Sequence, residues 1–226
     1  MASTYSTVKT DSDFAVSVAG KALQTPDKKP LRVPTNALAE AIATEWQANA
    51  KYNPAKMPLT SLAYTAIDRI GSQKEAIVEV LMVYIDTDTL SYRASSEKLA
   101  KQQEDQWDPV LEWASSFLGA AWESTTGVMP LTQSQELHKT IEKYLLSLSP
   151  MHLAAACILS SGFSSLVLAF AVLENHLSAE DAFLLSRLEE EFQAETWGRD
   201  AETDARMEKM ADEILGAARF LDLLAK

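Results

Sequence analysis

The longest apolar stretch of this sequence runs from Met151 to Leu173 and contains no Asp, Glu, Lys or Arg. It is long enough to cross a lipid bilayer as one helix, so its environment constrains every possible fold. Several serines and Gly162 lie near its middle, and no cluster of Lys or Arg flanks it to set an orientation in a membrane. We therefore predict two packed helices, or one bent helix, buried inside a helical bundle, with no stable membrane insertion.

The composition is that of a folded, acidic chain. Of its 226 residues 47% are apolar, which is enough for a hydrophobic core. The formal net charge is −12, and because such a chain repels a phosphate backbone, we exclude nucleic acid as a partner. The single cysteine, Cys157, cannot form an internal disulfide, which predicts a buried thiol and a reducing compartment.

The residues before the first helix predict a small β meander. Residues 14–18 place Phe or Val at every second position, as in a half-buried strand. Residues 22–25 and 31–33 follow turn-forming residues and predict two further short strands. Residues 1–12 are polar, and we expect no regular structure there.

The remainder of the chain predicts helices. Thr35 is a suitable N-cap for the first helix, and Asp108-Pro109 predicts a helix start in the middle of the chain. The helical patterns cover residues 36–52, 60–70, 73–85, 97–106, 109–118, 134–147, 151–173, 179–196 and 199–225. The predicted fold class is α+β, with a small β-rich N-terminal domain over residues 1–90 and a larger, mainly α-helical domain over residues 91–226.

A crowded acidic and aromatic segment, Glu189 to Gly198, ends the last helix but one. Glu191 and Glu195 stand four residues apart and share a helix face, where like charges repel. Carboxylates near a helix C-terminus also oppose the helix dipole. Two interpretations stay open: a surface that faces a partner, or a solvated acidic face with Phe192 and Trp197 turned into the core.

No sequence pattern supports catalysis, a metal site or a cofactor. The few glycines form no phosphate loop, the three histidines lack metal-ligand spacing, and no serine lies in a nucleophile elbow. One enzymatic alternative remains, a small-molecule enzyme with a carboxylate-lined cleft between the two domains. Its residues would be Asp68, Asp86, Asp88 and Arg93.

Several groups of residues, in order along the chain, resemble the signatures of one protein family. They are Pro30–Thr35 with Leu38–Ala43 and Glu45–Trp46; Met57–Thr60 with Leu62–Ala63 and Thr65–Asp68; Thr87–Arg93 with Gln103 and Trp107–Pro109; and Ser161–Gly162 with Ser165, Glu191–Gln193, Trp197–Gly198 and Asp200. Together they resemble the assembly chaperones that handle the alpha subunit of the F-type ATP synthase catalytic head. The resemblance runs from about residue 14 to the C-terminus, and Met1–Ser12 stands where relatives carry a longer basic and aromatic lead-in.

The resemblance implies a chaperone rather than an enzyme. Such a chaperone binds the unassembled alpha subunit and keeps it from aggregating until the beta subunit takes its place, and it needs no cofactor. The family's β-rich N-terminal domain and helical C-terminal domain agree with the residue patterns. We expect a monomer in a bacterial cytoplasm, or in the mitochondrial matrix if the chain is a processed eukaryotic form.

The acidic and aromatic segment is then the candidate contact with the alpha subunit. We predict that five of its residues bind the partner: Glu189, Glu191, Phe192, Glu195 and Trp197. The carboxylates would steer a basic patch of the partner, and the aromatic side chains would anchor it.

Three further residues are predicted to have structural roles: Trp46, Arg93 and Trp107. Trp46 lies on an amphipathic helix and is expected in the core. Arg93 either pairs with a buried acid such as Asp88 or Asp108, or faces the partner.

Overall fold

The structure is a computed structural model that describes residues 5–10, 12–18, 20–49, 51–127, 130–198 and 200–225. The chain divides into two compact units. The first holds Met1–Lys74, Leu148–Ala155 and Gly216–Lys226, and the second holds Glu75–Ser147 and Ala156–Leu215. Three of the four borders fall inside helices α3 (Gly71–Met82), α7 (Pro150–Phe163) and α11 (Ala201–Leu224), so each of these helices contributes to both units.

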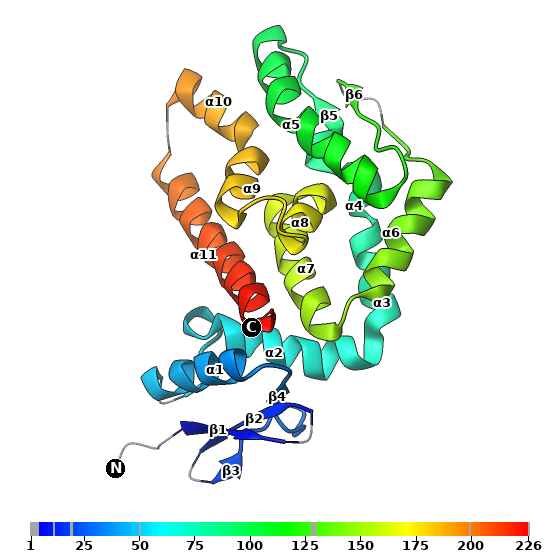
Figure 1. The fold of residues 1–226 in the computed structure, drawn as a ribbon. Helices are drawn as coiled ribbons and strands as arrows, with labels where there is room; N and C mark the ends of the chain where they lie inside the picture. Colours follow the sequence, from blue (N-terminus) through cyan, green and yellow to red (C-terminus); the bar gives the residue numbers. More distant parts are fainter. Residues whose placement is uncertain are drawn as a thin grey trace. The chain divides into compact units, whose positions relative to one another are not determined.

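The first unit begins with a small antiparallel sheet (Figure 1). Its strands are β1 (Tyr5–Lys9), β2 (Phe14–Val18), β3 (Lys21–Ala22) and β4 (Arg32–Val33). Strand β2 pairs with all three others, and the fully buried Val16 lies at its centre. The expectation that residues 1–12 lack regular structure was wrong for Tyr5–Lys9, because β1 pairs with the whole length of β2 through its backbone without any apolar pattern of its own. Residues 1–4 and 11 lie outside the described residues.

Helix α1 (Asn36–Ala48) follows the sheet and confirms the predicted N-cap, since the Thr35 hydroxyl accepts a hydrogen bond of 3.2 Å from the Leu38 N–H. The helix buries Leu38, Ala39, Ile42 and Ala43. Its Glu45 carboxylate caps helix α2 (Pro58–Tyr64): it accepts from the N–H groups of Leu59 and Thr60, both at 2.9 Å, and from the Thr60 hydroxyl at 2.6 Å. A negative side chain at a helix N-terminus satisfies free N–H groups and suits the helix dipole.

The rest of the first unit is fixed by contacts between distant residues. A 3-10 turn, η1 (Pro54–Lys56), precedes α2, and a π-helical segment, η2 (Thr65–Ile70), follows it. Asp68 of η2 closes the turn after β3, because its carboxylate accepts from the Thr25 hydroxyl at 2.7 Å and from the Asp27 N–H at 3.1 Å. At the other end of the chain, Leu223 of α11 accepts a hydrogen bond of 2.5 Å from the Thr35 hydroxyl. The C-terminal segment thereby joins the start of α1.

The second unit is mainly helical. Besides its parts of α3, α7 and α11 it contains α4 (Tyr84–Thr87), η3 (Thr89–Ser91), β5 (Tyr92–Arg93), α5 (Glu97–Leu118), β6 (Thr125–Thr126), α6 (Gln135–Ser147), α8 (Leu166–Leu173), α9 (Ala179–Ser186) and α10 (Leu188–Trp197). Strands β5 and β6 form a short parallel pair.

The apolar stretch forms two helices, α7 and α8, as predicted. They are separated at Ser164, which adopts a positive φ of 52°, and Ser165 caps α8 by accepting a hydrogen bond from the Leu168 N–H. Residues 166–172 of α8 are all buried. Among the residues that the structure describes, no helix is long and apolar enough to span a membrane.

Helix α5 is continuous where two helices were expected. The prediction of a new helix at Asp108-Pro109 was wrong, because Pro109 lies inside a helix that runs from Glu97 to Leu118. A proline removes one backbone hydrogen bond from a helix interior, and here tertiary contacts tolerate that loss. The Asp108 carboxylate binds Arg93 instead of capping a helix.

The helix predicted over 179–196 is in fact broken at Arg187, whose φ of −108° and ψ of 11° are not helical. Three glutamates, Glu189 to Glu191, therefore lie in the first turn of α10 rather than near the end of a long helix. The predicted conflict with the helix dipole does not arise for them, since carboxylates are favourable at a helix N-terminus.

The predicted α+β fold class is confirmed, with a four-stranded sheet near the N-terminus and mainly helices in the rest of the chain. The border between the two compact units differs from the predicted division into residues 1–90 and 91–226. Unit 1 ends earlier, at Lys74, and takes in parts of α7 and α11. Only tertiary packing can bring such late segments to an N-terminal unit, and the predicted domain division stays a prediction.

Candidate functional site

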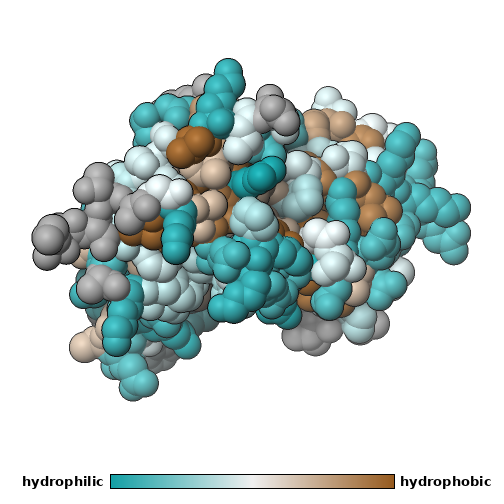
Figure 2. All heavy atoms as spheres, turned by 90° about the horizontal axis from the view of Figure 1, so that it is seen from below, coloured by the Kyte–Doolittle hydropathy of each residue, from teal (hydrophilic) through white to brown (hydrophobic). Residues whose placement is uncertain are grey.

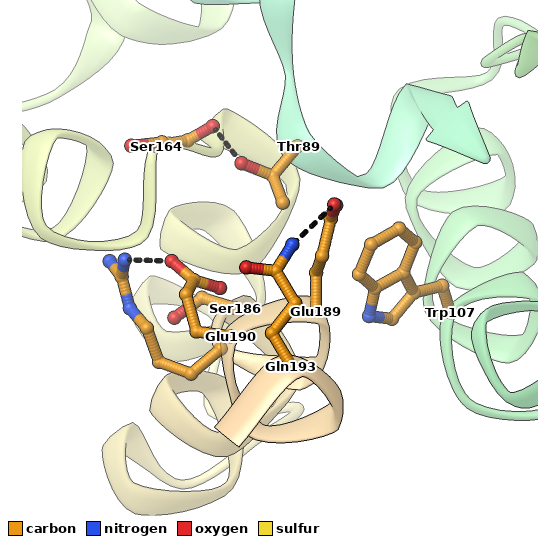
Figure 3. A pocket seen from close by; sticks show the side chains of 8 residues that line it. Thr89, Trp107, Ser164, Ser186, Glu189, Glu190 and Gln193 are labelled. Atoms are coloured by element: carbon orange, nitrogen blue, oxygen red, sulfur yellow. Dashed lines mark hydrogen bonds and ion pairs between the residues drawn. The ribbon is translucent and has the colours of Figure 1, made fainter. Parts of the chain in front are cut away.

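A pocket of about 350 Å³ lies in the second unit, at the bend between α9 and α10 (Figure 3). It is lined by Thr89, Trp107, Ser164, Ser186, Arg187, Glu189, Glu190 and Gln193. These residues come from η3, α5, the α7–α8 connection and the α9–α10 region, so four distant segments of the chain meet here. Three of them, Thr89, Trp107 and Gln193, belong to the segments that carry the family resemblance.

Asp88 does not line the pocket itself, but it holds the adjoining segment η3, which does. Its side chain is fully buried, and its carboxylate accepts hydrogen bonds from the Leu90 N–H at 3.0 Å and from the Val167 N–H at 3.1 Å. Burial raises the pKa of Asp88 to about 6, while the N–H donors around it oppose this shift. The carboxylate thus ties η3 to the N-terminus of α8, and the Thr89 hydroxyl adds a hydrogen bond of 2.9 Å to the Ser164 carbonyl.

Trp107 forms the aromatic wall and is almost completely buried. Its indole N–H donates a hydrogen bond of 3.0 Å to the Leu185 carbonyl near the end of α9. The Arg93 guanidinium lies 5.1 Å from the centre of the Trp107 ring and forms an ion pair with Asp108. Of the two partners considered for Arg93, the structure therefore selects Asp108, and the pair holds the indole in place.

Arg187 holds the bend between α9 and α10. Its guanidinium pairs with Glu190 at 2.9 Å, donates to the Gly162 carbonyl and lies over the Phe183 ring, 5.7 Å from its centre. These contacts reach three different helices, α10, α7 and α9, so the side chain fixes where α10 starts. No motif of the sequence had marked Arg187, because its role depends on a helix break that the helical pattern hides.

The predicted partner-binding residues all lie on α10, and none of them is fully buried. Glu189 lines the pocket and accepts a hydrogen bond of 3.3 Å from the Gln193 amide, as Figure 3 shows. Glu195 is exposed, and Glu191 is half-buried. We call Glu189, Glu191, Phe192, Glu195 and Trp197 the α10 surface.

Its two aromatic residues do not enter the core. Trp197 has 85% of its surface exposed, more than any other large hydrophobic side chain of the described residues. Phe192 is half-buried, and the Lys98 ammonium lies 5.2 Å from the centre of its ring. The interpretation that both turn into the core was therefore wrong for Trp197.

Trp46, expected in the core, is only half-buried and lies in the first unit. It belongs to a chain of aromatic rings, with centre-to-centre distances of 6.0 Å to Tyr5 and 6.5 Å to Tyr52. Tyr52 in turn contacts Tyr64 at 5.2 Å. Trp46 therefore packs against other aromatic side chains of the first unit and is not part of its fully buried core.

The residues of the enzymatic alternative have other partners. Asp68 closes a turn and Asp88 caps α8, as described above, while Asp86 accepts from the Gln133 N–H at 2.8 Å and contacts His138 at 3.3 Å. Arg93 pairs with Asp108. Within the described parts of the chain, no group of three or more His, Cys, Asp or Glu side chains could hold a metal ion.

The whole chain is similar to solved chaperone structures. The crystal structure of Atp12 from Paracoccus denitrificans is 39% identical, with a TM-score of 0.92 over 98% of this chain and 96% of that chain. A protein of Agrobacterium tumefaciens is 36% identical, with a TM-score of 0.91 over 97% of this chain and 84% of that chain. Likeness of fold at this level of sequence identity defines the class, an Atp12-like chaperone.

Sequence comparison gives the same family. The model of the family described as ATP12 chaperone protein matches residues 3–115. The mitochondrial protein atp12 of Schizosaccharomyces pombe is 31% identical over 200 residues, and the match covers 82% of this chain and 69% of that protein. The chain belongs to the ATP12 chaperone family, and the family predicted from the sequence motifs is confirmed.

Proposed function

We propose that the chain is an assembly chaperone for the catalytic head of the F-type ATP synthase. It binds the unassembled alpha subunit and prevents its aggregation until the beta subunit takes its place. The observation that carries this proposal is the α10 surface, which places an exposed Trp197 and several carboxylates on the same helix that lines the pocket.

The chemistry of the α10 surface suits a protein partner. An indole that is 85% exposed offers a large apolar area that another protein can cover. Glu191 and Glu195 share one face of α10 and would attract a basic patch, which raises the association rate more than the final affinity. A mixed apolar and charged contact of this kind can be released again, as a chaperone requires.

The pocket supplies the rigid support for this surface. Arg187 links the first turn of α10 to the Gly162 carbonyl, and Trp107 bonds to the end of α9, just before the bend. Asp88 joins η3 to α8 on another side of the pocket. A preorganised surface loses less conformational entropy when it binds. We therefore assign Arg93 and Trp107 positioning roles, and Glu189, Glu191, Phe192, Glu195 and Trp197 the direct contacts.

Exposed hydrophobic residues also occur outside the α10 surface. On the face shown in Figure 2, hydrophobic side chains occur in separate patches among hydrophilic ones. We propose that the chain acts as a monomer in a bacterial cytoplasm or a mitochondrial matrix. The relatives reported above, which come from a mitochondrion and from bacteria, support these two locations.

The experiment is co-purification of the full chain with its cognate ATP synthase alpha subunit, followed by addition of the beta subunit. We expect a soluble complex with alpha, and release of the chaperone when beta arrives. Aggregation of alpha at the same rate with and without the chain, measured by light scattering, would contradict the proposal.

A further inference from the structure

A second hollow lies in the second unit, between α9 and the adjoining part of α11, and shares no lining residue with the pocket at the α9–α10 bend. Its volume is about 190 Å³. It is lined by Ala179, Glu180, Phe183, Leu184, Ala211, Ile214 and Leu215. The surface inside it is apolar, and we call it the α9–α11 hollow.

The packing of α11 on α7 explains the depth of this hollow. A Cβ atom at Gly162 would lie 2.8 Å from the Ile214 Cδ1 atom, so the absence of a side chain there lets Ile214 sit deep. Ile214 is only 1% exposed. The two alanines, Ala179 and Ala211, are too short to fill the space above it. The depression is therefore built into the helix packing.

Leucine side chains stand at the edge of the hollow and face water. Leu184 is 64% exposed and Leu215 is 39% exposed. Exposed apolar surface around a concave site is typical of a place where another protein docks. The hollow has room for an aliphatic side chain and offers it no polar group to bind.

Three exposed carboxylates lie at the hollow or next to its lining residues in the helices. Glu180 lines it directly, and Glu208 and Asp212 lie three residues before Ala211 and Leu215, on the same side of α11. All three are exposed, and none of them forms an ion pair with a described Lys or Arg. These negative charges attract a basic segment of a partner and repel an acidic one.

We propose that the α9–α11 hollow is a second docking site, which takes a leucine-, isoleucine- or methionine-type side chain flanked by Lys or Arg in an exposed segment of the client. The assignment of that client as the unassembled alpha subunit rests on the proposed function. A second copy of this chain fits the hollow less well, because a net charge of −12 makes two copies repel each other.

The test compares two exposed aliphatic residues. Leu184→Asp places a charge at the hollow, and Val80→Asp places one at a side chain of equal exposure, 63%, on α3 outside it. We expect Leu184→Asp to weaken capture of the alpha subunit roughly tenfold or more, and Val80→Asp to leave it unchanged. Circular dichroism and thermal melting check that both variants fold.

A second variant changes the rim and leaves the hollow intact. The double substitution Glu208→Lys with Asp212→Lys should weaken capture and remove most of its salt dependence. It keeps the test decisive if Leu184→Asp fails to fold.

A peptide-binding experiment tests the α9–α11 hollow without the alpha subunit. A short labelled peptide with Leu flanked by Lys should bind the wild-type chain in fluorescence anisotropy, and its counterpart with Glu in place of Lys should not. If the wild type captures no alpha subunit but binds the basic peptide through Leu184, the proposed function fails and the docking site stands.

Three results would overturn the docking site. The first is capture of alpha and of the peptide by Leu184→Asp at wild-type strength. The second is equal weakening by Val80→Asp, which would indicate a general charge effect. The third is a concentration-dependent dimer that Leu184→Asp abolishes, which would assign the hollow to self-association.

Discussion

The Asp88 carboxylate accepts a backbone hydrogen bond from Val167, 79 residues further along the chain. Both residues are fully buried, and the contact joins the start of η3 to the first turn of α8. The carboxyl group is fully buried at the N-terminus of α8, where its hydrogen-bond partners are backbone N–H groups and the Ser165 side chain. Its protonation is therefore coupled to the stability of the second unit.

The first prediction concerns pH and Asp88→Asn. The folded chain keeps the Asp88 proton up to about pH 6, whereas the ordinary pKa is 3.8, so the folded state binds more protons between these values. The stabilising contribution is complete below pH 4 and is lost as pH rises through 6, by about 3 kcal/mol in the free energy of unfolding. The difference between wild type and Asp88→Asn, from urea unfolding at a series of pH values, should fall over this range and then stay constant. Parallel profiles would contradict the raised pKa.

Two tryptophan variants distinguish a residue that stabilises the fold, Trp107, from one proposed to contact the partner, Trp197. Trp107 is 1% exposed and bonded to the Leu185 carbonyl, so Trp107→Ala should lower the free energy of unfolding by about 3–5 kcal/mol. Trp197→Ala should change it by less than about 0.5 kcal/mol, because that side chain is mostly in water. Capture of the alpha subunit should instead weaken with Trp197→Ala. Equal unfolding midpoints for the two variants would contradict the difference in burial.

Charge reversal on the α10 surface should act on binding rather than on folding. Glu189→Lys, Glu191→Lys and Glu195→Lys should each weaken capture of the alpha subunit, by roughly tenfold where the contact is central, and lower its salt dependence. Glu142→Lys is the matched control, since Glu142 is an exposed glutamate on α6. Surface plasmon resonance with the alpha subunit at two salt concentrations measures both effects. Capture that depends on Glu142 as much as on α10 would point to net charge alone.

The half-burial of Trp46 reduces the stability effect expected for a core tryptophan. Its ring contacts Tyr5 and Tyr52, so Trp46→Ala removes two aromatic contacts and part of the buried area. We expect a loss of about 1–3 kcal/mol in the free energy of unfolding. Trp46→Phe, the control, keeps an aromatic ring and should cost less. No change in the melting temperature of Trp46→Ala would exclude a structural role.

Local patterns predicted what depends on neighbours in sequence. Thr35 was expected to cap α1 because a hydroxyl before an amphipathic helix can accept from its first N–H groups, and it does so. The uncharged stretch around Gly162 was expected to form two packed helices or one bent helix, and it forms two, α7 and α8. The motifs also identified the family, since residue order survives in the chain whatever its folded shape.

Local patterns failed where a distant side chain replaced a local partner. Asp108 was expected to cap a new helix at Pro109, but Arg93 binds its carboxylate and α5 continues. Strand β1 has no apolar pattern of its own, and it is a strand because its backbone pairs with that of β2.

The sequence by itself determined the fold class, the family and the buried position of α8, because apolar periodicity, caps and motif order are properties of the chain alone. Tertiary structure decided the rest. It broke the helix at Arg187 through contacts with Gly162, and it brought Thr89, Trp107 and Gln193 to one pocket. It also left Trp197 in water rather than in the core. Such outcomes depend on which side chains meet after folding, and free energies of packing and hydrogen bonding between distant residues are not encoded in any local spacing.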